Sequence, residues 1–411
     1  LPRSRLPGST DLEGELPQPL ARRRALETAT CIGHQVGAAG WPLPSGHGCY
    51  WTGLVHRMPH DGFQCDPLND GLYEGNTGIG LFLAALSAQT GEPEFRAFAL
   101  DALEPFRLFS RDYRHDPAFV AAFGLGFGGG LGGIAFGWSA AGQMLGEEHL
   151  LDDARQILAG IPAKSVIETD DIDVLMGLAG GIAGAAAVFR ATSDPKCRDL
   201  ALECAERLAD RERRTGWRGA DQDIPAMAHG LGGVARSLII ANEICPGGGF
   251  AAVARSAYAA EPEAGDCKIT GQHGAAHNGW CRGASGIALA RLGAPETMLD
   301  VQQSERLQKA LDTVETSGLL AVDQMCCGTF GAIDCLLEAG SRLDRQHLIG
   351  MAGRLAAGVL DDADAAGGFR LLPGIARGYG TPSLFQGISG IGYGLLRLAN
   401  PDRTPSILML G

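Results

Sequence analysis

Two kinds of helical pattern alternate along the chain. In the first, apolar residues recur at spacings of three and four with charged residues between them, as in residues 94–100, 197–203 and 307–312. This periodicity predicts amphipathic helices that bury one face. In the second, residues 182–189 and 287–292 are apolar on every side, which predicts fully buried helices. Strand patterns are scarce, so we expect an all-α protein.

A glycine motif precedes each of the apolar helical stretches. Gly-x-x-Gly followed by an apolar run occurs seven times, with first glycines at Gly75, Gly130, Gly177, Gly230, Gly283, Gly328 and Gly387. Successive first glycines lie 45 to 59 positions apart, a period that fits two helices and their loops. The glycine content, 61 of 411 residues, therefore reflects a repeat and not a low-complexity sequence.

The repeat predicts an (α/α) toroid, or barrel, of seven inner and seven outer helices. If the ring closes, all inner helices start at one rim, where their unpaired N–H groups and dipole ends converge. An open helical solenoid is the alternative. We expect residues 25–411 to form this single domain. Residues 1–24, rich in Pro, Arg, Leu and Gly, are expected to be a linker.

Composition narrows the function and the setting. The net charge of −13 and the lack of a basic run argue against nucleic-acid binding. Eleven cysteines, two of them adjacent, form a poor disulfide framework and indicate reduced thiols in a cytoplasmic protein. Residues 117–146 carry no charge, but their glycine density argues against a membrane span. Because the chain begins with Leu and not Met, we expect a fragment of a longer polypeptide.

Three cysteines occupy equivalent places in neighbouring repeats. Cys281 lies two residues before Gly283, and Cys326 and Cys327 lie two and one before Gly328. Neighbouring inner helices would bring these thiols to one rim. Zinc binds thiolates strongly, and catalytic zinc sites have three protein ligands and one open position. We therefore predict a three-cysteine zinc site; buried, inert thiols are the alternative.

Two further polar residues fall near the same rim. His229 directly precedes Gly230, the position that Cys327 has in its own unit, and is a candidate general acid or base. Packing is the alternative for a lone histidine. Asp173, four residues before Gly177, could cap a helix or orient a catalytic partner.

The residues on either side of Cys281 are candidates for binding substrate. Trp280 could form a wall of the pocket or fill the core, and Arg282 could face the cavity or lie in solvent. A polar loop over residues 262–278, with His273 and His277, immediately precedes this site. The other cysteines are interpreted as structural: Cys31, Cys49, Cys65, Cys197, Cys204, Cys245, Cys267 and Cys335.

These motifs, taken in order, resemble the lanthionine synthetase C-like cyclases, and closely the C-terminal cyclase domain of bifunctional class II lanthipeptide synthetases. The resemblance runs from about Ala25 to the end of the chain. It is carried by Asp173-Val174-Leu175-Met176-Gly177, Ala228-His229-Gly230, Trp280-Cys281-x-Gly283, Cys326-Cys327-Gly328 and the closing run from Leu384 to Leu396.

The resemblance implies a seven-fold α/α toroid with one Zn²⁺ ion. It implies an enzyme that adds cysteine thiols of a dehydrated precursor peptide to dehydroalanine or dehydrobutyrine, which closes thioether rings. A dehydratase domain would lie on the same full-length polypeptide. A peptide- or thiol-binding module without turnover is one alternative, and a zinc-dependent thiol alkylator of the prenyltransferase type is another.

The chain departs from most relatives at two positions. Cys327 stands where they have a histidine ligand, so the site resembles a minority three-cysteine subgroup that is associated with many different precursors. Arg282 stands where relatives often have tyrosine or histidine. A third thiolate adds negative charge to the zinc site, so a bound substrate sulfur should be more nucleophilic.

Overall fold

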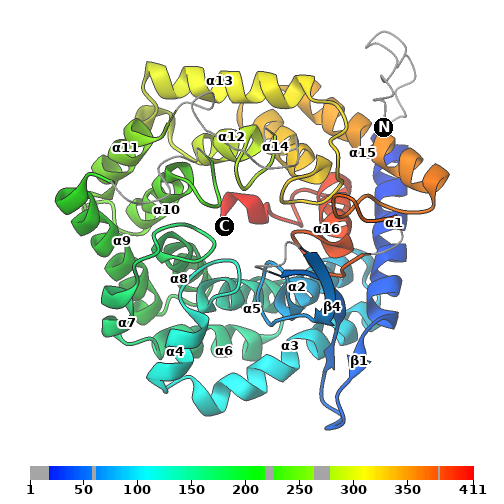
Figure 1. Cartoon of the computed structure of the whole chain (residues 1–411), viewed down its shortest axis with the longest axis horizontal. Coiled ribbons are helices and arrows are strands. Elements are labelled where there is room, and N and C mark those ends of the chain that lie inside the picture. Colours follow the sequence, from blue (N-terminus) through cyan, green and yellow to red (C-terminus); the bar gives the residue numbers. More distant parts are fainter. Residues whose placement is uncertain (1–17, 58–61, 218–225, 263–277, 378–379) are drawn as a thin grey trace.

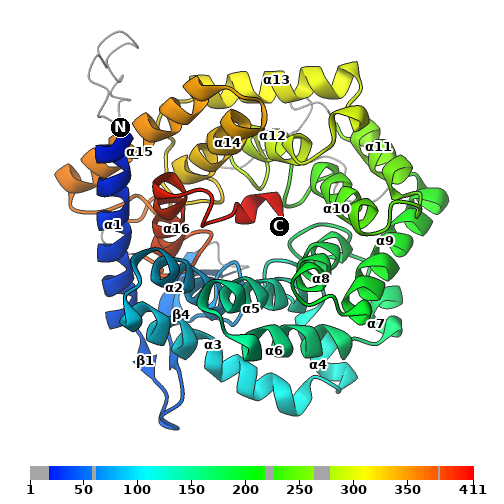
Figure 2. The ribbon, with the colours of Figure 1, turned by 180° about the vertical axis from the view of Figure 1, so that it is seen from behind.

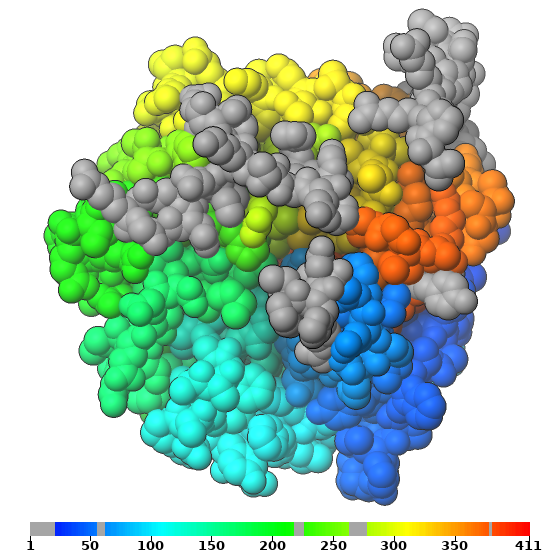
Figure 3. All heavy atoms as spheres, in the orientation of Figure 1, coloured from blue at the N-terminus to red at the C-terminus, as the bar shows by residue number. Residues whose placement is uncertain are grey.

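The computed structural model describes residues 18–57, 62–217, 226–262, 278–377 and 380–411. Helices dominate these residues and form a ring around a central axis (Figure 1). Figure 3 shows that the chain passes once around this ring, so that the orange C-terminal part returns to lie beside the blue N-terminal part. The predicted all-α toroid is confirmed, and the open solenoid is not found.

The inner ring consists of the helices that the glycine motifs predict. Each begins directly after the first glycine of its motif, and that glycine has an extended backbone. Within the described residues these inner helices are α2 (Asn76–Thr90), α5 (Leu131–Leu145), α8 (Leu178–Thr192), α10 (Leu231–Ile244), α12 (Ala284–Leu292), α14 (Thr329–Arg342) and α16 (Ile388–Ala399). Neighbours in this series are in contact, and α16 also contacts α2, so the ring is closed.

The outer ring is formed by the amphipathic helices. Six of them pack on the inner helix that directly precedes them in the chain: α3 (Pro93–Tyr113), α6 (Glu148–Ala159), α9 (Pro195–Thr215), α11 (Phe250–Ala260), α13 (Val301–Thr316) and α15 (Gln346–Ala366). The seventh partner comes from the other end of the sequence. Helix α1 (Gln18–Ala38) packs on α16, so the two ends of the domain complete one helix pair (Figure 2).

The region before the first repeat differs in part from expectation. Helix α1 begins at Gln18, inside the segment expected as a linker. Strands were not predicted, yet two antiparallel hairpins follow α1: β1 (Trp41–Pro42) with β2 (Cys49–Tyr50), and β3 (Thr52–Arg57) with β4 (Gly62–Pro67). Short helices α4 (Pro117–Phe123) and α7 (Ala163–Glu168) lie in loops of the ring.

The second glycine of each motif is required by a close backbone contact. In all seven units a Cβ atom at this glycine would lie 1.8 to 2.3 Å from the carbonyl oxygen of the residue six positions earlier. At Gly133, for example, the distance to Phe127 O would be 1.9 Å, far inside van der Waals contact. The missing side chain therefore lets each turn fold back tightly onto the first turn of its inner helix.

The C-terminal segment fills the middle of the ring. Its short 3₁₀ helix η2 (Ile407–Met409) is buried and lies at the centre in both views (Figures 1 and 2). Arg236 of α10 donates a hydrogen bond to Met409 O. Across the described ranges, none of the helices has the length and apolar character needed to span a bilayer.

The glycine contact yields a direct test. Gly133→Ala should lower the free energy of unfolding by about 1–3 kcal/mol, because the new methyl group must displace backbone. Gly353→Ala, inside outer helix α15 with open space around it, should instead raise stability by up to about 1 kcal/mol. Urea denaturation measures both variants. Equal effects would show that the motif glycines are not needed for the close contact.

Candidate metal centre and active site

The turns that precede the inner helices are hydrogen-bonded to one another around the rim. In the described part of the chain, six of the seven turns donate a backbone N–H to a carbonyl of the next turn, which fixes the position of these neighbouring repeats along the ring axis. Among the described residues these bonds join Tyr73 N to Gly128 O, Gly128 N to Leu175 O, Val174 N to Ala228 O, Trp280 N to Cys326 O, Cys326 N to Phe385 O, and Phe385 N to Tyr73 O, at 2.7 to 3.1 Å.

This network brings the three predicted thiols together. Cys281 precedes α12, and Cys326 and Cys327 precede α14, and the Trp280 N to Cys326 O bond is only 2.7 Å long. The Sγ atoms of Cys281 and Cys327 are 3.1 Å apart, and those of Cys326 and Cys327 are 3.4 Å apart. All three ligand atoms lie within 4.8 Å of one another. The cluster is thus built from two neighbouring repeats, as the sequence predicted.

The donor set fits a zinc ion. Tetrahedral zinc with Zn–S bonds of about 2.3 Å places two sulfurs about 3.8 Å apart, so small side-chain rotations would adapt these thiols to a metal. The three thiols are free and not joined by a disulfide. They also lie at the N-terminal ends of two helices, where the helix dipoles favour negative charge. Cys326 is buried, whereas Cys281 and Cys327 are half-buried and leave the cluster open on one side.

The thiols influence one another strongly. Hydrogen bonds from Cys326 and Cys327, helped by the charges of His229 and Arg282, hold the pKa of Cys281 well below its usual range. The contact with the Cys281 sulfur raises the pKa of Cys326 and of Cys327. The three thiols therefore titrate as one coupled group, in which the negative charge of one thiolate disfavours ionisation of the others.

His229 and Asp173 form a pair beside the thiols. The Nδ1 atom of His229 is 2.8 Å from Oδ2 of Asp173, and the His229 side chain is about a quarter exposed. The other carboxylate oxygen of Asp173 accepts a hydrogen bond from Met176 N at 2.7 Å. Asp173 therefore both braces its own turn and orients His229. With Nδ1–H donated to the carboxylate, Nε2 of His229 remains for proton transfer.

The two residues that flank Cys281 have different environments. Arg282 is exposed, and its charge acts on Cys281 and Cys327. Trp280 is fully buried, and its indole N–H donates to Leu408 O at 3.0 Å. This burial favours the core-filling role for Trp280. Residues 263–277, with His273 and His277, lie outside the described residues.

Two aromatic residues near the thiols had not been singled out from the sequence. Tyr73 stacks on Phe385 with ring centroids 4.7 Å apart, and Phe385 contacts the Trp280 ring at 5.1 Å. Burial, together with the charges of the nearby thiols, raises the pKa of Tyr73. Its position two residues before Gly75 matches that of Cys326 before Gly328, and this register could have drawn attention to it.

A cluster of one histidine and two glutamates, and a surface pocket, are weaker candidates for a functional site. His34, Glu92 and Glu94 also bring three ligand atoms together, but His34 and Glu94 are exposed and already paired with each other at 3.1 Å.

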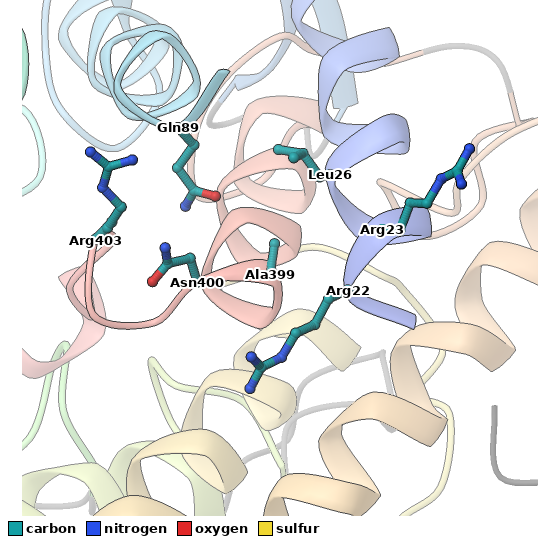
Figure 4. A pocket seen from close by; sticks show the side chains of 7 residues that line it. All are labelled: Arg22, Arg23, Leu26, Gln89, Ala399, Asn400 and Arg403. Carbon is teal, nitrogen blue, oxygen red and sulfur yellow. The ribbon is translucent and has the colours of Figure 1, made fainter. Parts of the chain in front are cut away.

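A pocket of about 310 Å³ lies between the start of α1 and the ends of α2 and α16 (Figure 4). It is lined by Arg22, Arg23, Leu26, Gln89, Ala399, Asn400 and Arg403. Arg403 follows the negative end of α16, and Arg23 is already paired with Glu27 at 2.7 Å, so the charges of these two arginines need no ligand.

Comparison with known proteins agrees with this architecture. Among solved structures the chain is similar to "Nisin cyclase" (TM-score 0.54, 17% identity), with 83% of this chain and 91% of that chain covered. Two epimerase structures are less similar. For a sugar epimerase from a ruminal bacterium the TM-score is 0.38 and the identity 10%, with 74% of this chain and 88% of that chain covered. For the cellobiose 2-epimerase from Bacillus thermoamylovorans B4167 the TM-score is 0.37 and the identity 11%, with 72% of this chain and 87% of that chain covered.

A search of curated proteins finds no match. The family model for lanthionine synthetase C-like proteins, in contrast, matches residues 66–409, which includes the seven glycine motifs, the thiol cluster and the His229–Asp173 pair. The chain therefore belongs to the lanthionine synthetase C-like family.

Proposed function

We propose that this protein is a zinc-dependent lanthionine cyclase, which adds cysteine thiols of a dehydrated precursor peptide to dehydroalanine or dehydrobutyrine. The family assignment supports the enzyme class. The observation that carries the proposal is the half-open cluster of Cys281, Cys326 and Cys327 beside the His229–Asp173 pair. A metal site with an open position and an oriented acid–base residue are the two components that this reaction needs.

The three sulfurs would hold the zinc ion, and the ion would lower the pKa of a substrate thiol so that it reacts as a thiolate. Cys326 anchors the site from the buried side. Cys281 and Cys327 border its accessible side. Because all three ligands are anionic, the centre carries one more negative charge than a site with two cysteines and a histidine, which favours a reactive substrate sulfur.

Thiol addition requires one proton to move. The sulfur forms a bond to the β-carbon while the carbon–carbon π bond breaks, and the electron pair passes to an enolate. Protonation of the α-carbon completes the thioether, so the proton lost by the thiol is balanced by the proton gained at carbon. We assign this proton transfer to Nε2 of His229, which Asp173 orients through Nδ1.

Arg282 supplies positive charge on the exposed side of the cluster. We assign it to binding the peptide, where a guanidinium can donate to a backbone carbonyl or to the developing enolate oxygen. The buried environment of Trp280 fits support of the turn and not direct contact with the peptide.

The three-cysteine ligand set supports placement in the minority subgroup of class II cyclases. In that case a dehydratase domain on the same full-length polypeptide prepares the substrate, since dehydrated residues must exist before a thiol can add to them. Each cysteine in the described part of the chain is a free thiol. This supports a reducing compartment such as the cytoplasm.

Removal of one ligand should abolish metal binding and catalysis together. Cys327→Ala should reduce zinc from about one ion per chain to near zero, because two thiolates bind weakly compared with three. Ring closure should fall to the uncatalysed rate. Metal content and the loss of free thiols from a synthetic peptide with cysteine and dehydroalanine measure both effects.

Cys65→Ala serves as the matched control, because Cys65 is an exposed thiol outside the cluster. It should retain zinc and activity. Full activity in zinc-free protein would refute the proposed centre. Zinc binding with no thiol consumption above the uncatalysed rate would instead favour a peptide- or thiol-binding module.

The carboxylate that orients His229 can be tested separately from the metal. Asp173→Asn should lower the cyclisation rate by about 100- to 10,000-fold, because the histidine tautomer is no longer fixed, while zinc content stays unchanged. Asp171→Asn, an exposed member of the same acidic run, should leave the rate unchanged. If both variants keep full activity, Asp173 has only a structural role.

A further inference from the structure

The residue directly before the first glycine of each motif is the accessible residue of its turn. In all seven turns this residue is half-buried or exposed, whereas the glycine that follows it is buried. His229, Arg282 and Cys327 occupy this place in the fourth, fifth and sixth units. Met176 and Gly129 occupy it in the third and second units. Since the turns are equivalent, Met176 and Gly129 belong to the same face of the ring as the proposed active site.

Met176 exposes its side chain beside the His229–Asp173 pair. It is 60% exposed, whereas the three residues before it in the same turn are at most 9% exposed. A single exposed apolar residue is common on a protein surface. This one, however, is tied to the pair: Asp173 Oδ1 accepts a hydrogen bond from Met176 N at 2.7 Å, and Asp173 Oδ2 is 2.8 Å from His229 Nδ1. One carboxylate therefore sets the position of Met176 relative to His229.

The fold does not require a glycine at position 129. At Gly126 and Gly130, in the same turn, a Cβ atom would lie 2.1 and 2.5 Å from backbone atoms, so both must be glycine. A Cβ atom at Gly129 would meet no heavy atom within 4 Å, and the Gly129 backbone lies outside the left-handed region that favours glycine. The missing side chain at Gly129 therefore leaves open space on the exposed face, next to the turn of Met176.

The proposed reaction gives this part of the rim a direction. The substrate sulfur would lie at the thiol cluster, and the α-carbon that receives the proton would lie at His229. Beyond His229, the next turns along the rim are those of the third and second units. They are joined by the bonds from Val174 N to Ala228 O at 3.1 Å and from Gly128 N to Leu175 O at 2.9 Å. A peptide residue next to the α-carbon would thus lie over Met176 and Gly129.

We propose that Met176 and Gly129 form a subsite for an apolar side chain of the precursor peptide, at a residue that directly flanks the dehydroalanine or dehydrobutyrine. The inference rests on the function proposed above. Met176 supplies the apolar contact, and its flexible thioether side chain adapts to partners of different shape. Gly129 supplies the space for the incoming side chain. Neither residue touches the reacting atoms, so the subsite selects the substrate.

Peptides that differ only in the residue flanking dehydroalanine test the subsite. Two series place leucine, serine or glycine either directly before or directly after the dehydroalanine. In one series the wild-type protein should have a kcat/KM about 10-fold higher for the leucine than for the serine peptide, because serine lacks the apolar contact. Met176→Ala should bring this ratio close to one. Met176→Leu, which restores an apolar side chain, should preserve it.

Gly129→Leu tests the open space. The new side chain would fill it, so kcat/KM for the leucine peptide should fall by about 10-fold relative to that for the glycine peptide. Gly247→Leu is the matched control. Gly247 is also exposed with no heavy atom near a Cβ atom, but it follows the C-terminal end of α10, at the opposite end of an inner helix from the rim. This variant should keep the wild-type ratio.

Met176 and Gly129 are both exposed, so neither substitution disturbs the core. Zinc content and the midpoint of urea denaturation check this for each variant. Equal kcat/KM values for the leucine and serine peptides in both series, or wild-type ratios in both Met176→Ala and Gly129→Leu, would overturn the subsite while cyclisation persists. A wild-type protein that consumes no thiol from any of these peptides would instead show that the proposed function is wrong, and the subsite with it.

Discussion

The site depends on backbone contact between the turns of neighbouring repeats. Each turn approaches its own inner helix so closely that a Cβ at the second motif glycine would overlap a carbonyl oxygen. The same turns are hydrogen-bonded to one another around the rim. Side chains that are far apart in sequence therefore lie at equivalent positions along the axis of the ring. A cluster of three thiols from two repeats, with a histidine from a third, needs no dedicated loop to assemble it.

The ring distributes the proposed chemistry among its repeats. The proposed metal ligands come from the fifth and sixth units, His229 from the fourth, and its carboxylate partner from the third. The C-terminal segment fills the centre beneath the rim and supports Trp280 through Leu408. Substrate would thus approach the open side of the cluster, where Cys281, Cys327 and Arg282 are accessible.

The sequence predicted those features that repeat in register. The glycine motifs marked the start of all seven inner helices, and the offset from those glycines identified Cys281, Cys326 and Cys327 as neighbours. The pairing of α1 with α16 was not predicted, because helix periodicity does not specify which partner covers a buried face. The place of Tyr73 in the rim was missed for a related reason: an aromatic residue before an apolar helix indicates core, and its connection to Cys326 through the Phe385 backbone depends on ring closure.

Zinc K-edge X-ray absorption tests the central claim most directly. We predict three sulfur ligands at about 2.3 Å and one lighter atom in the resting protein, and four sulfurs after addition of a peptide thiol. A nitrogen ligand in place of the third sulfur, or an unchanged ligand set after thiol addition, would contradict the three-thiolate centre with an open position.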